Sequence, residues 1–243
     1  MTYVPPVVRH LADRLGGLGW VTDLLVAGSL ATGDYVPGVS DLDLVALTGG
    51  PVGAARQEVL AGLHRELDGG AAHGLDLGCV YVDAGRLADL GALHPTWTHG
   101  SLVQRSLSGV TRAELVRHGF AVLGRPPTSV LPGMTDNDVR RAARAELCGY
   151  WAQTVRRPLW WLNPVIAELG LTSMARGRHA LQTGQLLTKT QAIERAHAPA
   201  WLKDQLRARR RGEQVTSPRG RTALIAWRDA RRTVACACRR APA

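Results

Sequence analysis

The feature that most constrains this chain is a pair of aspartates that follows a strand-like segment and a Gly-Ser turn. The apolar, β-branched segment 21–28 predicts a strand, and the alternating segment 41–47 predicts the next one. The second strand opens with Asp41 and Asp43, which point to the same face because they are two residues apart. Neighbouring carboxylates disfavour each other's charge, and a divalent cation relieves this repulsion. Mg²⁺ is commonly held by one or two carboxylates and substrate phosphates, so the pattern predicts a magnesium–phosphate site.

The residues between the two strands strengthen this interpretation. The first strand ends in Gly28-Ser29, where glycine permits close approach and serine offers a hydroxyl and a backbone N–H to a phosphate. Eleven residues rich in glycine and proline then lead to Asp41. An Asp-x-Asp pair alone is often only solvated charge on a strand, but the preceding Gly-Ser pair makes the combination more specific.

The remaining patterns predict an α-and-β domain followed by a helical one. Helices are expected over 5–16 and 53–68, and a further strand over 75–83. The Pro- and Gly-rich stretch 121–134 predicts a break between domains, which we place at 1–130 and 131–243. Helices are expected in the second domain over 135–157, 165–183, 189–197, 199–211 and 218–238, the first with Thr135 and Asp138 at capping-box spacing.

Charge and composition limit the class of protein. The net charge is +10, and residues 201–243 hold 12 Lys and Arg against 3 Asp and Glu. Such a segment is typical of a solvated arginine-rich helix or of a surface for a polyanion such as RNA. No stretch has the roughly 20 uncharged apolar residues of a membrane span. The charged N-terminus lacks the apolar run of a signal peptide, so we expect a cytoplasmic protein without a membrane partner. Four cysteines in such a chain predict no disulfide framework.

The motifs over 28–43 resemble the nucleotidyltransferase superfamily that shares the polymerase-β palm. The resemblance is closest to the bacterial streptomycin/spectinomycin aminoglycoside adenylyltransferases. It implies an α+β fold, with a polymerase-β-like domain of small mixed sheet and helices before an all-α C-terminal domain. It also implies that Gly28 and Ser29, with Ser40, bind the triphosphate of ATP, and that Asp41 and Asp43 bind Mg²⁺.

The same resemblance assigns a third carboxylate. The family has a Glu on a later strand, as general base or metal ligand, and Asp76 stands at that position here. Its shorter side chain is a departure from the family that changes its reach toward an acceptor hydroxyl. Asp76 is therefore expected both as base and as metal ligand.

In the helical domain the resemblance implies two cations for the nucleotide phosphates, Arg176 and Lys189. Thr188 and Gln191 have capping-box spacing, which places Lys189 in the first turn of a helix. A cation is disfavoured there by about 0.3–1 kcal/mol. A bound polyphosphate would make the position of this cation favourable, because the helix N-terminus and the ammonium group would both attract the phosphate. This supports a phosphate-binding role for Lys189.

The acceptor site is implied less completely. The family uses a Trp of the first domain and acidic residues of the second to bind the cationic antibiotic. Trp97 is in a comparable place, and Glu168 and Glu146 are the nearest acidic candidates.

The resemblance as a whole implies Mg²⁺-dependent transfer of AMP from ATP to a hydroxyl of an aminoglycoside-type antibiotic, with release of pyrophosphate. Two alternatives stay open: a nucleotidyltransferase that modifies tRNA or another macromolecule through the basic 201–243 segment, and a non-catalytic nucleotide-binding regulator. We expect a monomer that binds ATP and a small-molecule acceptor.

Overall fold

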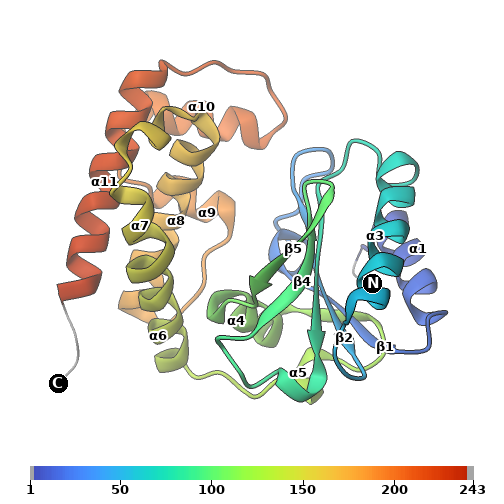
Figure 1. Ribbon diagram of the computed structural model, residues 1–243. Coiled ribbons are helices and arrows are strands. Elements are labelled where there is room, and N and C mark those ends of the chain that lie inside the picture. Colours follow the sequence, from blue (N-terminus) through green and yellow to red (C-terminus); the bar gives the residue numbers. More distant parts are fainter. Residues whose placement is uncertain (1–2, 240–243) are drawn as a thin grey trace. The chain divides into compact units, whose positions relative to one another are not determined.

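The computed structural model describes residues 3–239, which form two compact units (Figure 1). Unit 1, Met1–Gly133, combines a six-stranded sheet with helices. Unit 2, Met134–Ala243, contains helices and no strand among its described residues. The expected α+β class is confirmed. In the described residues no helix is long and apolar enough to cross a membrane.

Unit 1 contains three strands that the sequence predicted and three that it did not. The predicted segments correspond to β1 (Val21–Val26), β2 (Leu42–Thr48) and β3 (Leu77–Asp83). The unpredicted strands are β4 (Leu93–Thr98), β5 (Ser101–Ser106) and β6 (Phe120–Leu123). The helices of this unit are α1 (Pro6–Gly16), α2 (Gly28–Ala31), α3 (Ala54–Gly69), η1 (Ala84–Arg86), α4 (Gly109–His118) and α5 (Pro127–Val130).

The sheet is mixed, with the strand order β5-β4-β3-β2-β1-β6. Only β2 and β3 pair in parallel, and the other neighbours are antiparallel. A parallel pair needs a crossover connection, which α3 supplies here. The starts of β2 and β3 consequently lie at the same edge of the sheet.

The two faces of the sheet bury different sets of apolar residues. One face packs on α1 and α3, with Leu11 and Leu60 among the residues of that core. The other face packs on α4 and α5, through Leu115 and Leu131. The apolar residues of β2 alternate between these cores, and Leu44 and Val45 belong to opposite ones.

Unit 2 is built from helices that bury apolar faces against one another. Its helices are α6 (Asp136–Glu146), the π-helical turn η2 (Leu147–Trp151), α7 (Ala152–Val155), η3 (Pro158–Leu162), α8 (Pro164–Thr183), α9 (Lys189–Arg195), α10 (Ala200–Arg210) and α11 (Arg219–Arg239). Capping boxes at Thr135 and Asp138 and at Thr188 and Gln191 are both confirmed. These side chains satisfy backbone groups that would otherwise have no partner at the starts of α6 and α9.

The cysteines of unit 2 depart from expectation. Cys148, in η2, forms a disulfide with Cys238, near the end of α11. Cys79 and Cys236 are free thiols. The expectation of no disulfide was wrong because residues 90 apart in sequence are brought together by the packing of α11 against η2, which sequence spacing does not reveal.

Candidate active site

The candidate site begins where β1 leads into α2. The backbone N–H of Ala27 donates to the carbonyl oxygen of Asp43 over 2.9 Å, which holds β1 and β2 together at this point. Gly28 follows with a φ of +60°, a conformation that favours glycine. A Cβ atom on Gly28 would lie 2.0 Å from Oδ2 of Asp43. Both the backbone conformation and the contact with the carboxylate therefore require glycine.

Asp41, Asp43 and Asp76 lie at one edge of the sheet. Asp41 directly precedes β2 and Asp76 directly precedes β3, and all three aspartates are exposed. The N–H of Leu42 donates to the carbonyl oxygen of Asp76 over 2.7 Å, and the parallel register pairs Leu42 with Leu77. Asp41 is therefore beside Asp76. Because register partners share a face and side chains alternate along a strand, the three carboxylates emerge on the same face.

Asp76 also has a histidine neighbour that the sequence patterns did not indicate. Nδ1 of His99 lies 3.4 Å from Oδ1 of Asp76. His99 has a φ of +47° and precedes Gly100, whose φ is +73°, in the turn between β4 and β5. Two consecutive positive φ angles are typical of a tight hairpin. The His-Gly dipeptide was therefore the only feature of the sequence that could have predicted this turn.

A metal ion at this edge would need ligands besides protein side chains. Across the described part of the chain, no group of three or more His, Cys, Asp or Glu residues is arranged to hold a metal ion. The parallel register nevertheless places Asp41 and Asp43 on one exposed face of β2. When Mg²⁺ binds together with a phosphate, one or two carboxylates usually hold it, and oxygens of the phosphate and of water fill its other coordination positions. The donor set therefore fits a magnesium ion that arrives with a polyphosphate.

The two serines expected at the triphosphate have different surroundings. Ser29 is half-buried in the short helix α2, directly after Gly28. Ser40 is buried, and its hydroxyl oxygen accepts a hydrogen bond from the N–H of Val36 over 3.0 Å. Ser40 thus orders the loop that leads to Asp41.

A pocket of about 230 Å³ lies beside Asp43 on the same face of the sheet. Its wall includes Gly78 of β3, Thr96 of β4, Arg105 of β5, and Ser108, which directly precedes α4. Arg105 and Ser108 were not foreseen, because β5 was not predicted and its residues carry no motif. The pocket offers hydroxyl groups and one guanidinium next to an exposed carboxylate, a combination suited to a polar ligand.

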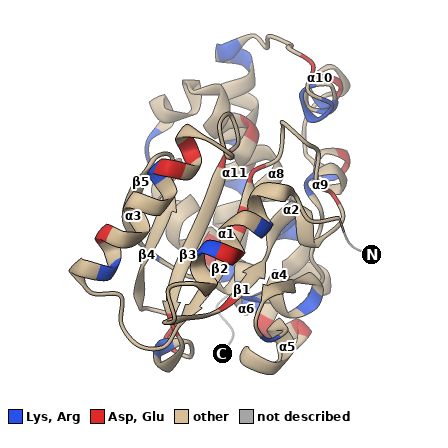
Figure 2. Ribbon diagram, turned by 90° about the vertical axis from the view of Figure 1, so that its right-hand side faces the viewer, with Lys and Arg blue, Asp and Glu red and all other residues tan. Residues whose placement is uncertain are grey.

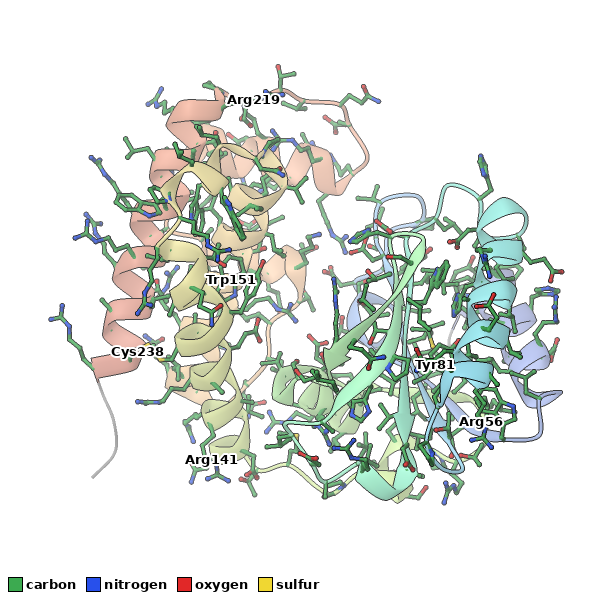
Figure 3. All side chains as sticks on the ribbon, viewed as in Figure 1. Arg56, Tyr81, Arg141, Trp151, Arg219 and Cys238 are labelled. Carbon is green, nitrogen blue, oxygen red and sulfur yellow. A yellow bond between two sulfur atoms is a disulfide. The ribbon has the colours of Figure 1, made fainter. Side chains whose placement is uncertain are left out.

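Trp97 does not present its ring at this site. The side chain is 2% exposed, its indole stacks on His64 with ring centroids 4.9 Å apart, and its Nε1–H donates to Asp68 over 3.1 Å. His64 is itself hydrogen-bonded to the buried Tyr81 (Figure 3), and burial lowers the pKa of His64 to about 3. Alternation along β4 sends Trp97 to the face opposite Asp43. The expected stacking platform is corrected to a core residue.

In unit 2, the side chain of Arg176 contacts the backbone shortly before Lys189. Nε–H of Arg176, on α8, donates to the carbonyl oxygen of Leu187 over 3.0 Å, two residues before Lys189. Lys189 is exposed and is the first residue of α9, as its capping box predicted. Arg178 has a different role, since its Nη1 lies 2.7 Å from Oδ1 of the buried Asp229 on α11.

The acidic residues proposed for the acceptor are not presented as open carboxylates. Glu168, on α8, forms an ion pair with Arg209 over 2.7 Å. Burial raises the pKa of Glu168, and the charges of Arg209 and Lys189 oppose that shift. Glu146 is half-buried at the end of α6. Glu168 therefore stabilises the contact between α8 and α10, a role that its position on α8 alone did not indicate.

The comparisons with known proteins bear on the fold. Neither a protein-family model nor a curated protein sequence matches the chain. Among solved structures, the chain is similar to spectinomycin adenyltransferase AAD(9) from Enterococcus faecialis, crystallised with ATP and spectinomycin. The TM-score is 0.70 at 16% sequence identity, and the match covers 93% of this chain and 96% of the other. The chain thus shares the fold of this adenyltransferase, and the resemblance expected from the sequence is confirmed at the level of the fold.

Proposed function

We propose that this chain is a Mg²⁺-dependent nucleotidyltransferase that moves AMP from ATP to a hydroxyl group of a small molecule. The observation that carries the proposal is the register of β2 and β3, which puts Asp41, Asp43 and Asp76 on one exposed face at the same edge of the sheet, with Gly28 against Asp43. The fold shared with an adenyltransferase supports the same reaction class. A fold alone hosts many functions, so the carboxylates and their geometry bear most of the argument.

Asp41 and Asp43 would hold the metal ion together with oxygens of the triphosphate. When bound, Mg²⁺ supplies positive charge that offsets the negative charge developing on the phosphates during transfer. Gly28 would let the backbone approach the phosphates, Ser29 would offer its hydroxyl and backbone N–H, and Ser40 holds the loop before Asp41 in position. Arg176 and Lys189 are proposed as further phosphate-binding cations, on the family resemblance of the sequence.

Asp76 is proposed as the general base. The acceptor hydroxyl gives its proton to the Asp76 carboxylate, and its oxygen forms a bond to the α-phosphorus of ATP. The bond between the α-phosphorus and the bridging oxygen breaks, and pyrophosphate leaves with the electron pair. Magnesium ligation by Asp76 is a second proposed role, because Asp76 is beside Asp41 in the register.

The proposed acceptor is an aminoglycoside-type antibiotic, with spectinomycin and streptomycin the first compounds to test. The structurally similar adenyltransferase was solved with spectinomycin, which motivates this choice. The polar pocket beside Asp43 would receive the acceptor hydroxyl. Neither Trp97 nor Glu168 is included, because the first is in the core and the second is paired with Arg209.

Pyrophosphate release tests the proposal directly. The full chain is incubated with ATP and Mg²⁺ and a panel of hydroxyl acceptors that includes spectinomycin, streptomycin and tRNA. We expect release with at least one small-molecule acceptor and a product heavier by one adenylyl group. Binding of ATP without release for any acceptor would favour the regulator, and release with tRNA alone would favour the macromolecular alternative.

The role of Asp76 has its own test. Asp76→Asn should lower kcat by roughly 100-fold or more, the usual contribution of a general base, while the affinity for ATP stays within a few fold. An effect confined to ATP affinity would remove Asp76 as the base. Asp83→Asn, a carboxylate at the far end of the same strand, serves as the control.

A further inference from the structure

The outer face of α11 carries a straight row of arginines. Arg221, Arg228, Arg232 and Arg239 are exposed and are separated by seven, four and seven residues. At 100° per residue these spacings keep all four within about 20° of one line along the helix. At 1.5 Å per residue the row is about 27 Å long. Figure 3 labels Arg219 and Cys238 near the two ends of this helix.

The row faces solvent because the opposite face of α11 is anchored. Small apolar residues, among them Ala226, Ala230 and Ala237, are buried in the core of unit 2, and α11 packs on α8 and η2. The buried pair of Arg178 and Asp229 fixes the rotation of α11 about its own axis. Asp229 is the only acidic residue of α11, and it is on the buried face. The outer face therefore carries no negative charge.

Several other arginines of this unit are paired with acidic neighbours. Arg207 pairs with Glu194 and Asp204, and Arg211 pairs with Glu213. Basic residues also colour α10 in Figure 2, but its Arg209 is paired with Glu168. By contrast, within residues 3–239, Arg228, Arg232 and Arg239 form no ion pair or hydrogen bond. Arg221 lies over the Trp201 ring at 4.9 Å, which leaves its charge uncompensated.

We propose that this row is a docking surface for the phosphodiester backbone of a nucleic acid. Guanidinium groups bind phosphate oxygens through two parallel hydrogen bonds, and an acid-free line of them matches a polyanion of regular charge spacing. A membrane surface fits less well, because a helix lying in a membrane needs a broad exposed apolar face. Leu224 is the one large apolar residue of α11 that is exposed, at 44%. The row contacts phosphates and not base edges, so it binds without regard to sequence.

Salt dependence of binding is the first test. The full chain is titrated into a fluorescein-labelled 20-nucleotide single-stranded RNA and, separately, a 20-base-pair DNA duplex, between 50 and 300 mM salt. Four phosphate contacts predict a slope of log Kd against log salt of about 3 for the single strand and about 3.6 for the duplex. Absence of binding to either probe at 50 mM salt would overturn the proposal.

Two double variants that each remove two positive charges separate the effect of the row from the effect of net charge. Arg228→Gln with Arg232→Gln removes the central two arginines, and Arg65→Gln with Arg86→Gln removes two exposed arginines of unit 1. The first pair should weaken binding at least tenfold and reduce the single-strand slope by about 1.4. The second pair should change affinity by less than threefold. Equal losses in both pairs, or tighter binding to polyglutamate or to phosphatidylserine vesicles than to either nucleic acid, would refute the docking surface.

Discussion

Near each end of β1 a glycine lies against an aspartate, and the two aspartates differ in their exposure to solvent. Near the start of β1, Asp23 is fully buried, and a Cβ atom on Gly124 would lie 2.5 Å from its Oδ1. Beyond the other end, a Cβ atom on Gly28 would lie 2.0 Å from Oδ2 of Asp43, which is exposed. Both glycines have positive φ angles, +75° and +60°. A glycine with a positive φ angle thus lies against a buried carboxylate in one case and against an exposed carboxylate in the other.

The difference lies in the burial of each carboxylate. Asp23 accepts hydrogen bonds from the backbone N–H and the guanidinium of Arg125 and from the hydroxyl of Thr22. A carboxylate with this many donors stabilises the fold and has no capacity left for a ligand. Asp43 is exposed beside Asp41 and next to a polar pocket, as a ligand-binding carboxylate must be. The comparison teaches that burial, more than the residue type, separates an aspartate that stabilises the fold from one that a ligand could reach.

The largest expected effect is the loss of turnover in Asp41→Asn and Asp43→Asn. Each change removes a charge that would hold Mg²⁺ with the triphosphate, and we expect kcat/KM to fall by roughly 1,000-fold or more. The free energy of unfolding should change by less than about 1 kcal/mol, since both side chains are exposed. Pyrophosphate release and urea unfolding measure the two quantities. Asp13→Asn, an exposed aspartate of α1, is the matched control, and near-normal turnover in both site variants would remove the metal assignment.

The reverse pattern is expected for Asp23→Asn. The loss of the charge weakens hydrogen bonds from Arg125 and Thr22 in a buried place, which should lower the free energy of unfolding by about 2–3 kcal/mol. The folded fraction should keep its turnover within about twofold. Chemical denaturation at pH 7 gives the first number. If Asp23→Asn lost turnover without losing stability, the division between the two aspartates would be wrong.

A smaller effect should follow from filling the two glycines. Gly28→Ala and Gly124→Ala each force a Cβ atom against a carboxylate and strain a left-handed backbone, at a cost of about 1–3 kcal/mol. Stability should fall in both variants, but only Gly28→Ala should lower the turnover of folded protein, by about tenfold. Gly33→Ala controls for backbone strain alone, because its φ is +72° and no atom lies within 4 Å of its Cβ position. Equal turnover in the variants at residues 28 and 124 would show that contact with Asp43 does not matter for activity.

Local patterns predicted the part of unit 1 that carries the aspartates. Alternation predicted β1, β2 and β3, and the Asp-x-Asp spacing predicted that Asp41 and Asp43 share a face, because both follow from the period of a single strand. The segments of β4 and β5 mix polar and apolar residues around a two-residue turn and gave no clear period. Their absence from the predicted sheet is also why Arg105 and His99 were missed.

Tertiary packing decided what the sequence could not. The large aromatic ring of Trp97 suggested a stacking surface for a ligand, yet its register on β4 turns the ring toward His64 in the core. The partner of Glu168 is 41 residues away in sequence, and those of Cys148 and Arg178 are farther, so no local pattern connects them. Helix boundaries in unit 2 were predictable because capping boxes are local. Which faces of these helices pack against each other could not be predicted, because it depends on residues far apart in the sequence.

The smallest expected effect is a difference in acid stability between the natural chain and Asp23→Asn. Burial raises the pKa of Asp23, but hydrogen bonds from Arg125 and Thr22 and the charge of Arg125 outweigh it, so the pKa lies below the usual 3.8. The unfolded chain therefore takes up this proton at a higher pH than the folded one. The stability that Asp23 contributes is complete above about pH 4 and is lost as the pH falls through its folded pKa. Urea midpoints between pH 6 and pH 2.5 should thus fall more steeply for the natural chain than for Asp23→Asn, and Asp13→Asn should follow the natural chain. Parallel curves for all three would mean that Asp23 titrates in the folded protein as it does in the unfolded chain.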